Sequence, residues 1–468
     1  MSQWLYGGLL PEGLAYHPGY GMFLGLYGGL SGSSLHTAAL ITNGVVAGLC
    51  VLMAGRLMER HGAPQWASYC AALIAAIHPS LSASSRIAWP ETLLVALLLT
   101  LGLLVDSDRW MLTGSVAAAA LAVHPRAVVI FGAVLFVAVL ERRTRQMMYG
   151  AAPLLLGTGL LLQLTGSWPS ARINAAQNLG SGPDPITTMS GQWLALGAST
   201  GGLALIGLTV AVLAIRKRSW PPSGLFFSLS AIGMLVLGGW VLAGSARMDT
   251  IMYGRYIGPW AVPLSLVGLA AVSRGGVTRR IAAALSISAA AAAVLVTAVS
   301  GQVDQPSRRI MTLGLGFLWR IFDDRLTVII LVSLVIAVTG VVASRRNALI
   351  PMALLGALAI SSTIVNHDHL HEVGRIADGQ VTTAKDIPHD VTCLAHDSSS
   401  KSYAMWLYRL ELPNIDHRRV DLSAGEKPCG PYVVAEITAL DQCIDAKIVG
   451  TEPRANWGMW KYPRQGCD

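Results

Sequence analysis

The segment 74–105, IAAIHPSLSASSRIAWPETLLVALLLTLGLLV, shows how most of the chain is organised. Two apolar runs flank a short polar stretch, and the second run, residues 92–105, contains no charged residue. A helix needs about 20 apolar residues to cross a bilayer, and runs near this length recur through the first 365 residues. The segment therefore predicts a bundle of membrane-spanning helices joined by short connections.

The composition excludes an ordinary soluble enzyme for most of the length. Of the 468 residues, 53% are hydrophobic and 13% are charged, and the mean hydropathy is +0.53. A typical soluble domain has about a quarter charged residues. We predict twelve spans, which follow the apolar runs: 38–58, 67–83, 90–105, 110–123, 126–140, 149–165, 193–215, 223–243, 255–273, 280–300, 326–343 and 347–364.

Basic residues gather between these runs, which indicates an orientation in the membrane rather than binding to nucleic acid. The positive-inside rule places the following clusters in the cytoplasm: Arg56 and Arg60; Arg142, Arg143 and Arg145; Arg216, Lys217 and Arg218; Arg274, Arg279 and Arg280; Arg345 and Arg346. The connections on the other side of the membrane and the carboxy-terminal tail are then external. Among them, residues 308–325 fit either an interfacial helix or the start of the next span. The amino terminus is also left outside, so we expect a first transmembrane helix upstream of Met1.

The last part of the chain has a different character. Residues 1–365 carry 23 Lys and Arg against 11 Asp and Glu, whereas residues 366–468 carry 11 against 15. We expect strands at 391–395, 418–422, 431–437, 446–450 and 457–462, with a helix at 400–410. The predicted fold is thus an all-α polytopic membrane domain over 1–365, with an external loop and short helix in 1–37. A small α/β extracytoplasmic domain follows over 366–468.

Four of the six cysteines lie in this tail. An even set in an external domain predicts two disulfides, although four cysteines permit three pairings. We expect Cys429–Cys443 together with Cys393–Cys467. The spacings lack the paired C-x-x-C of a zinc site, so a structural metal is the weaker interpretation.

A histidine tract follows the last predicted span. In NHDHLHE, residues 366–372, His367, His369 and His371 alternate. Such spacing can ligate a metal from one face of a strand, although a polar connector is the more common explanation. The sequence thus leaves a divalent cation open as a cofactor.

Charged residues near the outer ends of spans are the main candidates for function, because charge is costly inside a bilayer. In SSRIAWPETLL, Arg86 lies just outside one helix and Glu91 lies in the first turn of the next. In AVHPRAVV, His124 and Arg126 occupy a tight connection and could clamp a phosphate. Ordinary explanations also exist: Glu91 suits a helix N-terminus, Arg86 can reach lipid headgroups, and a histidine beside a proline is commonly a turn residue.

Two more segments carry candidate residues. In MYGRYIGPWAVPL, Arg255 and Tyr256 open a helix, where an arginine opposes the helix dipole and needs another partner such as an anion. The amino-terminal GLLPEGLAYHPGYGMFLGLYGG places Glu12 and His17 in an irregular loop before a short apolar helix. Glu12 could act as a general base, although a lone carboxylate in a loop is commonly solvated and inert.

Taken in order, these segments resemble the multi-spanning glycosyltransferases of the GT-C fold, which include the protein O-mannosyltransferases and the aminoarabinose transferases. YHPGYGMFLGLYG resembles their loop-to-short-helix segment, and GRLMERHG with IAAIHPSLSASSRIAWPETLLVALLL resembles the next spans. GRYIGPWAVPL resembles the Arg-Tyr helix late in the domain. The chain departs from the pattern in one respect, since the usual first helix and the acidic residue directly after it would lie before Met1.

The resemblance implies transfer of a sugar, with inversion, from a polyprenyl-phosphate carrier to a glycan, lipid or protein acceptor of the cell envelope. It implies that Glu12 substitutes as the base that takes the acceptor proton. The implied substrate-binding residues, three of them arginines for the lipid phosphate, are Arg86, Arg126, Arg255, His124, Tyr256, His17 and Glu91.

Two alternatives of other classes stay open. One is a GT-C-like scaffold that binds a carrier lipid or a partner without catalysis. The other is a transporter of lipid-linked sugars, which is disfavoured because the sequence has no convincing internal repeat and its candidate charges lie at the outer ends of spans.

Overall fold

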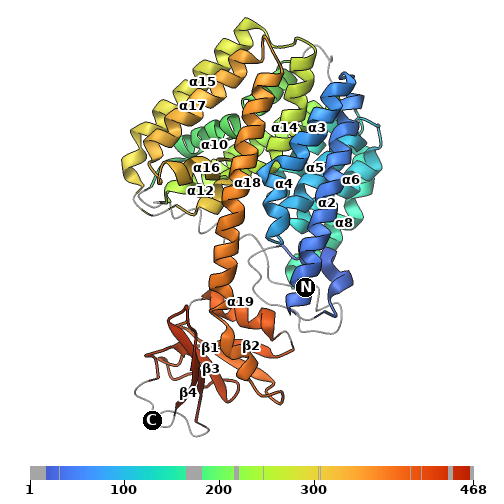
Figure 1. Cartoon of the computed structure of the whole chain (residues 1–468). Coiled ribbons are helices and arrows are strands. Elements are labelled where there is room, and N and C mark those ends of the chain that lie inside the picture. The colour runs from blue at the N-terminus through green and yellow to red at the C-terminus, as the bar shows by residue number, and fades with distance from the viewer. Residues whose placement is uncertain are drawn as a thin grey trace. The chain divides into compact units, whose positions relative to one another are not determined.

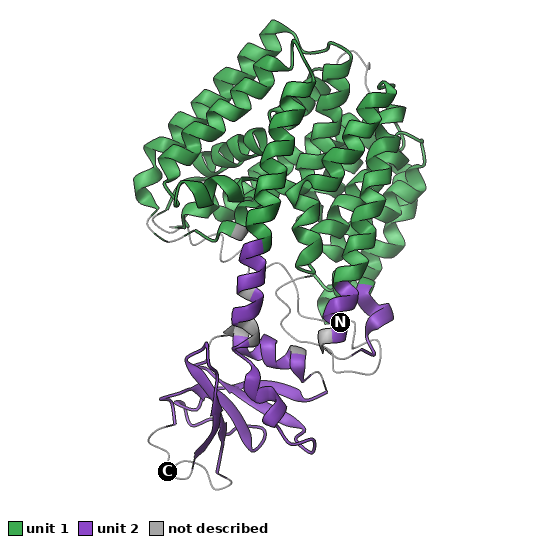
Figure 2. Ribbon diagram, in the orientation of Figure 1, with its two compact units in different colours: residues 1, 10–23, 40–367 green, residues 2–9, 24–39, 368–468 purple. Residues whose placement is uncertain are grey.

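The computed structural model describes residues 17–463 except 31, 165–181, 215–220, 246, 304, 306, 401, 413 and 441–445. The chain divides into two compact units, coloured separately in Figure 2. The first, which we call the helical unit, consists mainly of residues 40–367. The second contains residues 368–468, and we call these residues the sheet domain.

Seven helices in the described part of the chain are long and apolar enough to cross a membrane (Figure 1). They are α2 (Gly32–Arg60), α8 (Thr144–Leu164), α12 (Pro222–Leu242), α14 (Gly254–Ser273), α15 (Arg279–Ala298), α17 (Leu326–Ala343) and α18 (Leu349–Asp378). The remaining predicted spans are shorter apolar helices or a bent pair. The shorter ones are α3 (Gln65–Ile77), which leads into α4 (Pro79–Ser82), and α5 (Glu91–Val105), α6 (Trp110–Val123) and α7 (Ala127–Leu140). The chain is therefore a multi-pass membrane protein with an all-α membrane region.

The span predicted over 193–215 is broken into two helices. The structure has α10 (Pro185–Ser199) and α11 (Leu203–Ala214), which meet at an angle of 111°. Gly201 and Gly202 form the corner with φ angles of 54° and 80°, in the left-handed region that favours glycine. A Cβ atom at Gly201 would lie 2.5 Å from the carbonyl oxygen of Pro351, so no larger residue fits there.

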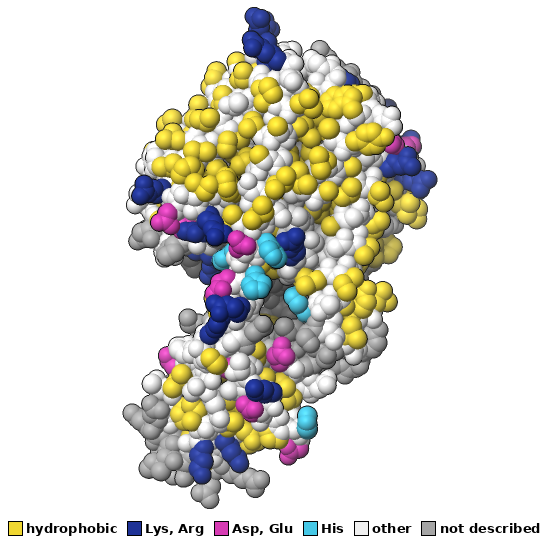
Figure 3. Space-filling view, viewed as in Figure 1, with side chains coloured by type: hydrophobic (Ala, Val, Ile, Leu, Met, Phe, Trp, Pro, Cys, Tyr) yellow, Lys and Arg dark blue, Asp and Glu magenta, His cyan; other side chains and the backbone are white. Residues whose placement is uncertain are grey.

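Apolar side chains cover much of the visible face of the helical unit (Figure 3). Exposed apolar residues of this unit include Leu52, Leu156 and Ile287, with exposed fractions of 67%, 77% and 69%. A large exposed apolar surface is expected where helices face lipid, because the hydrocarbon core has no water to exclude. Internal contacts are close: a Cβ at Gly114 of α6 would lie 1.9 Å from the Met147 carbonyl oxygen on α8.

Short helical turns connect the longer helices. They are α1 (Gly19–Phe23), η2 (Leu24–Tyr27), η3 (Ser84–Arg86), α13 (Met248–Ile251), η5 (Ser300–Gln302), η6 (Arg309–Leu315) and α16 (Gly316–Ile321). Residues 308–325, which fit either an interfacial helix or the start of the next span, contain two short pieces, η6 and α16. The backbone of η6 packs directly on the first residue of α14, because a Cβ at Gly254 would lie 2.3 Å from the Thr312 carbonyl oxygen.

The sheet domain contains all five predicted strands and the predicted helix, each within two residues of its expected ends. The strands are β1 (Cys393–Asp397), β2 (Asp416–Val420), β3 (Tyr432–Glu436), β4 (Lys447–Thr451) and β5 (Trp457–Lys461), in the order β2-β1-β3-β5-β4. Strand β1 pairs in parallel with β2 and β3, and β5 is antiparallel to β3 and β4. Helix α19 (Ser402–Glu411) connects β1 to β2, and a 3-10 turn, η7 (Thr382–Asp386), precedes β1. This is the expected small α/β fold.

The histidine tract at 366–372 is helical, not extended, because α18 continues to Asp378. Alternate residues on a helix point about 200° apart, so the spacing that suits one face of a strand does not bring these side chains together. No group of three His, Cys, Asp or Glu side chains in the described residues could hold a metal ion.

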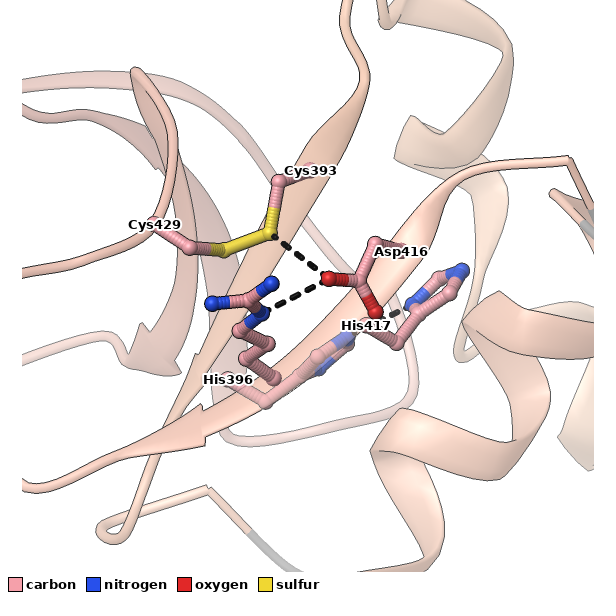
Figure 4. The surroundings of a disulfide bond; sticks show 6 residues. Cys393, His396, Asp416, His417 and Cys429 are labelled. Carbon is pink, nitrogen blue, oxygen red and sulfur yellow. Dashed lines mark hydrogen bonds and ion pairs between the residues drawn. A yellow bond between two sulfur atoms is a disulfide. The ribbon is translucent and has the colours of Figure 1, made fainter. Parts of the chain in front are cut away.

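The disulfide prediction requires correction. Cys393 is bonded to Cys429, with Cα atoms 5.9 Å apart, rather than to Cys467, and Cys429 is not bonded to Cys443 (Figure 4). Cys393 begins β1 and Cys429 lies just before β3. Because these two strands are parallel neighbours, both cysteines lie at the amino-terminal ends of the strands, close to each other. Cys443 and Cys467 lie outside the described residues.

A buried histidine pair lies next to this disulfide in the sheet domain (Figure 4). Nε2 of His396 lies 3.0 Å from Nδ1 of His417, and Nε2 of His417 donates to the Leu412 carbonyl oxygen at 3.0 Å. Both histidines are therefore compatible with the neutral form. Burial, together with the neighbouring His417, lowers the pKa of His396 to about 3, and burial also lowers the pKa of His417.

A second buried network fixes η7 against the last strands. The Tyr408 hydroxyl donates to Oε1 of Glu452 at 2.5 Å, and the backbone N–H of Thr382 donates to Oε2 at 2.6 Å. Burial raises the pKa of Glu452, but hydrogen bonds from Thr383, Tyr408 and Thr382 outweigh it and hold this pKa below its usual value.

The first prediction concerns the disulfide. Mass mapping of the unreduced protein should find a Cys393–Cys429 linked peptide. Because this bond closes a segment of 36 residues, the Cys393→Ser/Cys429→Ser variant should lose about 3 to 4 kcal/mol of unfolding free energy in the sheet domain. A Cys393–Cys467 linked peptide in its place would contradict the pairing.

The second prediction concerns pH. An unfolded histidine titrates near 6.5, whereas His396 in the fold does not gain its proton until about pH 3. The unfolded chain thus binds more protons between these values, so stability is complete above about pH 6.5 and falls as the pH drops. The loss for His396 is about 1.4 kcal/mol per pH unit. Hydrogen exchange of the β1 and β2 peptides, corrected for the intrinsic pH dependence, measures it.

The matched control for the pH prediction is the exposed His389 of the same domain. His396→Gln should flatten the pH dependence, and His389→Gln should leave it unchanged. Equal slopes in the wild type and the His396→Gln variant would rule out this role of the buried pair.

Candidate functional site

The first residues of three helices meet at one point in the helical unit. Glu91 is the first residue of α5, Arg126 is the N-cap of α7, and Arg255 lies in the first turn of α14. Pro90 and the His124-Pro125 turn end the preceding segments, so the local sequence places each of these residues at a helix start. We call these three residues the Glu91 cluster.

One oxygen atom of the Glu91 carboxylate accepts hydrogen bonds from both arginines. Arg126 donates through Nη2 to Oε1 of Glu91 at 2.5 Å, and Arg255 donates through Nε to the same oxygen at 2.7 Å. Glu91 is fully buried, and the exposed fractions of the Arg126 and Arg255 side chains are 5% and 11%. A further bond from Nη1 of Arg126 to the Arg255 carbonyl oxygen, 2.9 Å long, ties α7 to α14.

Aromatic rings and His124 complete the surroundings of the arginines. The Arg255 guanidinium lies over the Trp89 ring, 3.9 Å from its centroid, and that of Arg126 lies 4.9 Å from the centroid of the Tyr256 ring. The backbone N–H of Arg126 donates to Nδ1 of His124 at 3.0 Å. Rings that flank guanidinium groups stabilise them through cation–π attraction and limit their movement.

Among the described residues, the Glu91 cluster pairs two guanidinium groups with one carboxylate. The N-termini of α5, α7 and α14 add the partial positive ends of three helix dipoles. Such an arrangement is suited to an anion, because both side-chain donors and helix N-termini favour negative charge. A phosphate group matches the planar donor geometry of arginine.

The amino-terminal segment packs close to this cluster. Nδ1 of His17 lies 2.6 Å from the Leu121 carbonyl oxygen near the end of α6. A Cβ atom at Gly19 would lie 2.5 Å from the carbonyl carbon of Ala122, so α1 rests directly on the backbone that leads into His124.

Not all of the predicted residues join the cluster. Arg86 ends the 3-10 turn η3, its side chain is exposed, and within the described residues it makes no hydrogen bond or ion pair to Glu91, Arg126 or Arg255. The structure therefore brings together two of the three predicted arginines. Glu12 lies outside the described residues.

Sequence reasoning missed two residues that support the site. Trp89 supplies the ring under Arg255, and Asn43 of α2 donates through Nδ2 to the Trp89 carbonyl oxygen at 3.1 Å. Asn43 is fully buried in an apolar helix, and a polar residue at membrane depth is itself a functional signal. No comparable signal identified Trp89, because tryptophan at the end of a span is a common membrane-interface residue.

Comparison with known proteins bears on the fold. No protein-family model and no curated protein matches this sequence. The structure is similar to ArnT from Cupriavidus metallidurans, in its apo crystal structure (TM-score 0.51, 14% identity) and its crystal structure bound to undecaprenyl phosphate (TM-score 0.50, 13% identity). Each alignment covers 95% of this chain and 87% of the ArnT chain. This likeness supports the expected fold, which is a GT-C-like membrane bundle followed by a small sheet-containing domain.

Proposed function

We propose that this chain is a membrane glycosyltransferase that moves a sugar from a polyprenyl-phosphate carrier to an acceptor of the cell envelope. The observation that carries the proposal is the Glu91 cluster, in which two arginines share one buried carboxylate at three helix starts. ArnT, which has a similar fold, has been crystallised with undecaprenyl phosphate bound. A carrier of this class would offer both the phosphate for the arginines and the lipid chain for the membrane.

In the proposed reaction, a nucleophilic group of the acceptor attacks the anomeric carbon of the sugar from the face opposite the phosphate. The bond between this carbon and the phosphate oxygen breaks, and its electron pair leaves with the phosphate. Arg126 and Arg255 stabilise the negative charge that grows on the leaving oxygen. Glu12 is the proposed base for the acceptor proton, and the acceptor belongs to a cell-envelope glycan, lipid or protein.

Glu91 has a separate role in this proposal. Its Oε1 already accepts from both arginines, so it holds the two guanidinium groups in place before the carrier binds. Donors that are fixed in advance stabilise a transition state without reorganisation during the reaction. His124 and Tyr256 position Arg126, and His17 holds the amino-terminal segment beside the site.

We further propose that the site and the sheet domain face the outside of the cell. The support is the distribution of basic residues in the sequence, which marks the opposite connections as cytoplasmic. A disulfide in the sheet domain agrees with this orientation, since disulfides persist in oxidising compartments.

The third prediction tests the arginines. Arg255→Ala should reduce sugar transfer about a hundredfold, which corresponds to about 3 kcal/mol of transition-state stabilisation, and should weaken binding of undecaprenyl phosphate in nanodiscs. Arg255→Lys should retain part of the binding, because lysine keeps the charge but not the planar donor geometry.

The control for this prediction is Arg56→Ala, which removes a side chain from an exposed pair with Glu59. It should leave both measurements unchanged. Normal carrier binding by a well-folded Arg255→Ala protein would contradict the proposed role of Arg255 in binding the phosphate. Carrier binding by the wild type without transfer of any sugar would instead indicate the non-catalytic scaffold.

The fourth prediction tests orientation. A cysteine introduced at the exposed Ser423 of the sheet domain should react in intact cells with a maleimide that does not cross membranes. A cysteine at the exposed Arg145, in a predicted cytoplasmic cluster, should react only after the cells are opened. The reverse pattern would overturn the orientation.

A further inference from the structure

The turn η6 contains a backbone conformation that is unusual for its residue. Leu313 has a φ angle of 43° and a ψ angle of −97°, and a positive φ is uncommon for residues other than glycine. Its side chain is buried, and a Cβ atom at Gly258 of α14 would lie 3.1 Å from its Cδ1. A strained residue persists only where its surroundings hold it, and such residues gather at functional sites. Neighbouring contacts must therefore keep this turn in place.

Two polar side chains of α18 make such contacts. Asn366 donates through Nδ2 to the Leu313 carbonyl oxygen at 3.3 Å, and the Ser362 hydroxyl donates to the Gly314 carbonyl oxygen at 2.9 Å. Both α18 residues are buried. They are four positions apart, so they lie on one face of the helix. This face supplies hydrogen-bond donors to the carbonyl groups of the strained turn itself.

The same turn also contacts the start of α14, where Arg255 is located. A Cβ atom at Gly254 would lie 2.3 Å from the Thr312 carbonyl oxygen, so the two backbones are in direct contact. Nη1 of Arg255 lies 4.0 Å from the sulfur of Met311. All of these residues, and the two donors on α18, belong to the helical unit. η6 thus lies between a pair of buried donors and one arginine of the Glu91 cluster.

We propose that Asn366 and Ser362 are positioning residues for Arg255, and that they act through η6. This inference rests on the proposed function, in which Arg255 binds the phosphate of the carrier. The two donors keep Leu313 in its strained conformation, and the strained turn determines where η6 meets the start of α14. Without these bonds the turn relaxes, and the Arg255 guanidinium is no longer fixed in advance for the phosphate.

Gly316 offers a second way to disturb the same contact. Its φ of −52° and ψ of −33° suit any residue, but a Cβ atom there would lie 2.9 Å from Oδ1 of Asn366. The three heavy atoms nearest to that Cβ all belong to the Asn366 side chain. Gly316→Ala should therefore displace this side chain without straining the backbone. In the Asn366→Ala background the obstruction is absent, so the added methyl group should have no further effect.

The first measurement examines the turn without any carrier. In hydrogen exchange of full-length protein in nanodiscs, Asn366→Ala and Gly316→Ala should each accelerate exchange of a peptide covering 309–318 about fivefold, as expected for the loss of one hydrogen bond. The double variant should match the single ones. Ser362→Ala should also accelerate exchange. Its control is Ser361→Ala, the same change at a partly exposed position of α18, which should leave exchange unaltered.

The second measurement tests whether the effect passes through Arg255. The probe is undecaprenyl phosphate, bound to the same proteins in nanodiscs. Asn366→Ala should weaken its binding about fivefold when Arg255 is present, but less than about twofold in the Arg255→Ala background. The effects are not additive because a positioning residue acts only through the group that it positions. A residue that merely stabilises the fold would weaken binding by the same factor in both backgrounds.

Two results would overturn the positioning role. One is unchanged exchange of the 309–318 peptide in both Asn366→Ala and Ser362→Ala. The other is carrier binding that Asn366→Ala leaves unaltered, or weakens equally with and without Arg255. Failure of the proposed function is distinct, since the wild type would then not bind undecaprenyl phosphate at all. The positioning role would fall with it, whereas the exchange data would still show whether α18 holds the turn.

Discussion

The membrane region depends on a fully buried carboxylate that two arginines share. Each of these charges would be costly to bury by itself, and breaking a buried ion pair by removing one partner leaves an uncompensated charge. Glu91, Arg126 and Arg255 come from helices that are far apart in the sequence, so the pairings fix α5, α7 and α14 relative to one another. Close backbone packing, such as that of η6 on Gly254, then follows from where α14 must begin.

Different interactions stabilise the fold of the sheet domain. Its sheet is small, and a domain of this size has limited apolar area to bury. The Cys393–Cys429 bond, the neutral His396–His417 pair and the Tyr408–Glu452 network supply additional constraints at separate places. The disulfide restricts the unfolded chain, whereas the two buried polar networks act in the folded state by satisfying groups that water no longer reaches.

Sequence patterns predicted the elements more completely than the contacts between them. The span at 110–123 matches α6, and the five strands of the tail were found from alternation and turn residues. The disulfide could not be predicted, because it depends on β1 and β3 being parallel neighbours. The corner at Gly201 was missed because a hydropathy profile does not show where a helix ends and the chain changes direction. Arg86 was grouped with Arg126 and Arg255 because all three lie at helix ends, but a sequence does not tell which way a side chain points.

Glu91 holds together two arginines that would otherwise repel each other. Without Glu91, two guanidinium groups would face each other in a region of low dielectric, and their repulsion would separate the helices before any carrier bound. Glu91 thus keeps the first turns of α5, α7 and α14 assembled around Arg126 and Arg255. In the proposed function, the phosphate of the carrier adds to the pairing of Glu91 with the arginines instead of replacing it.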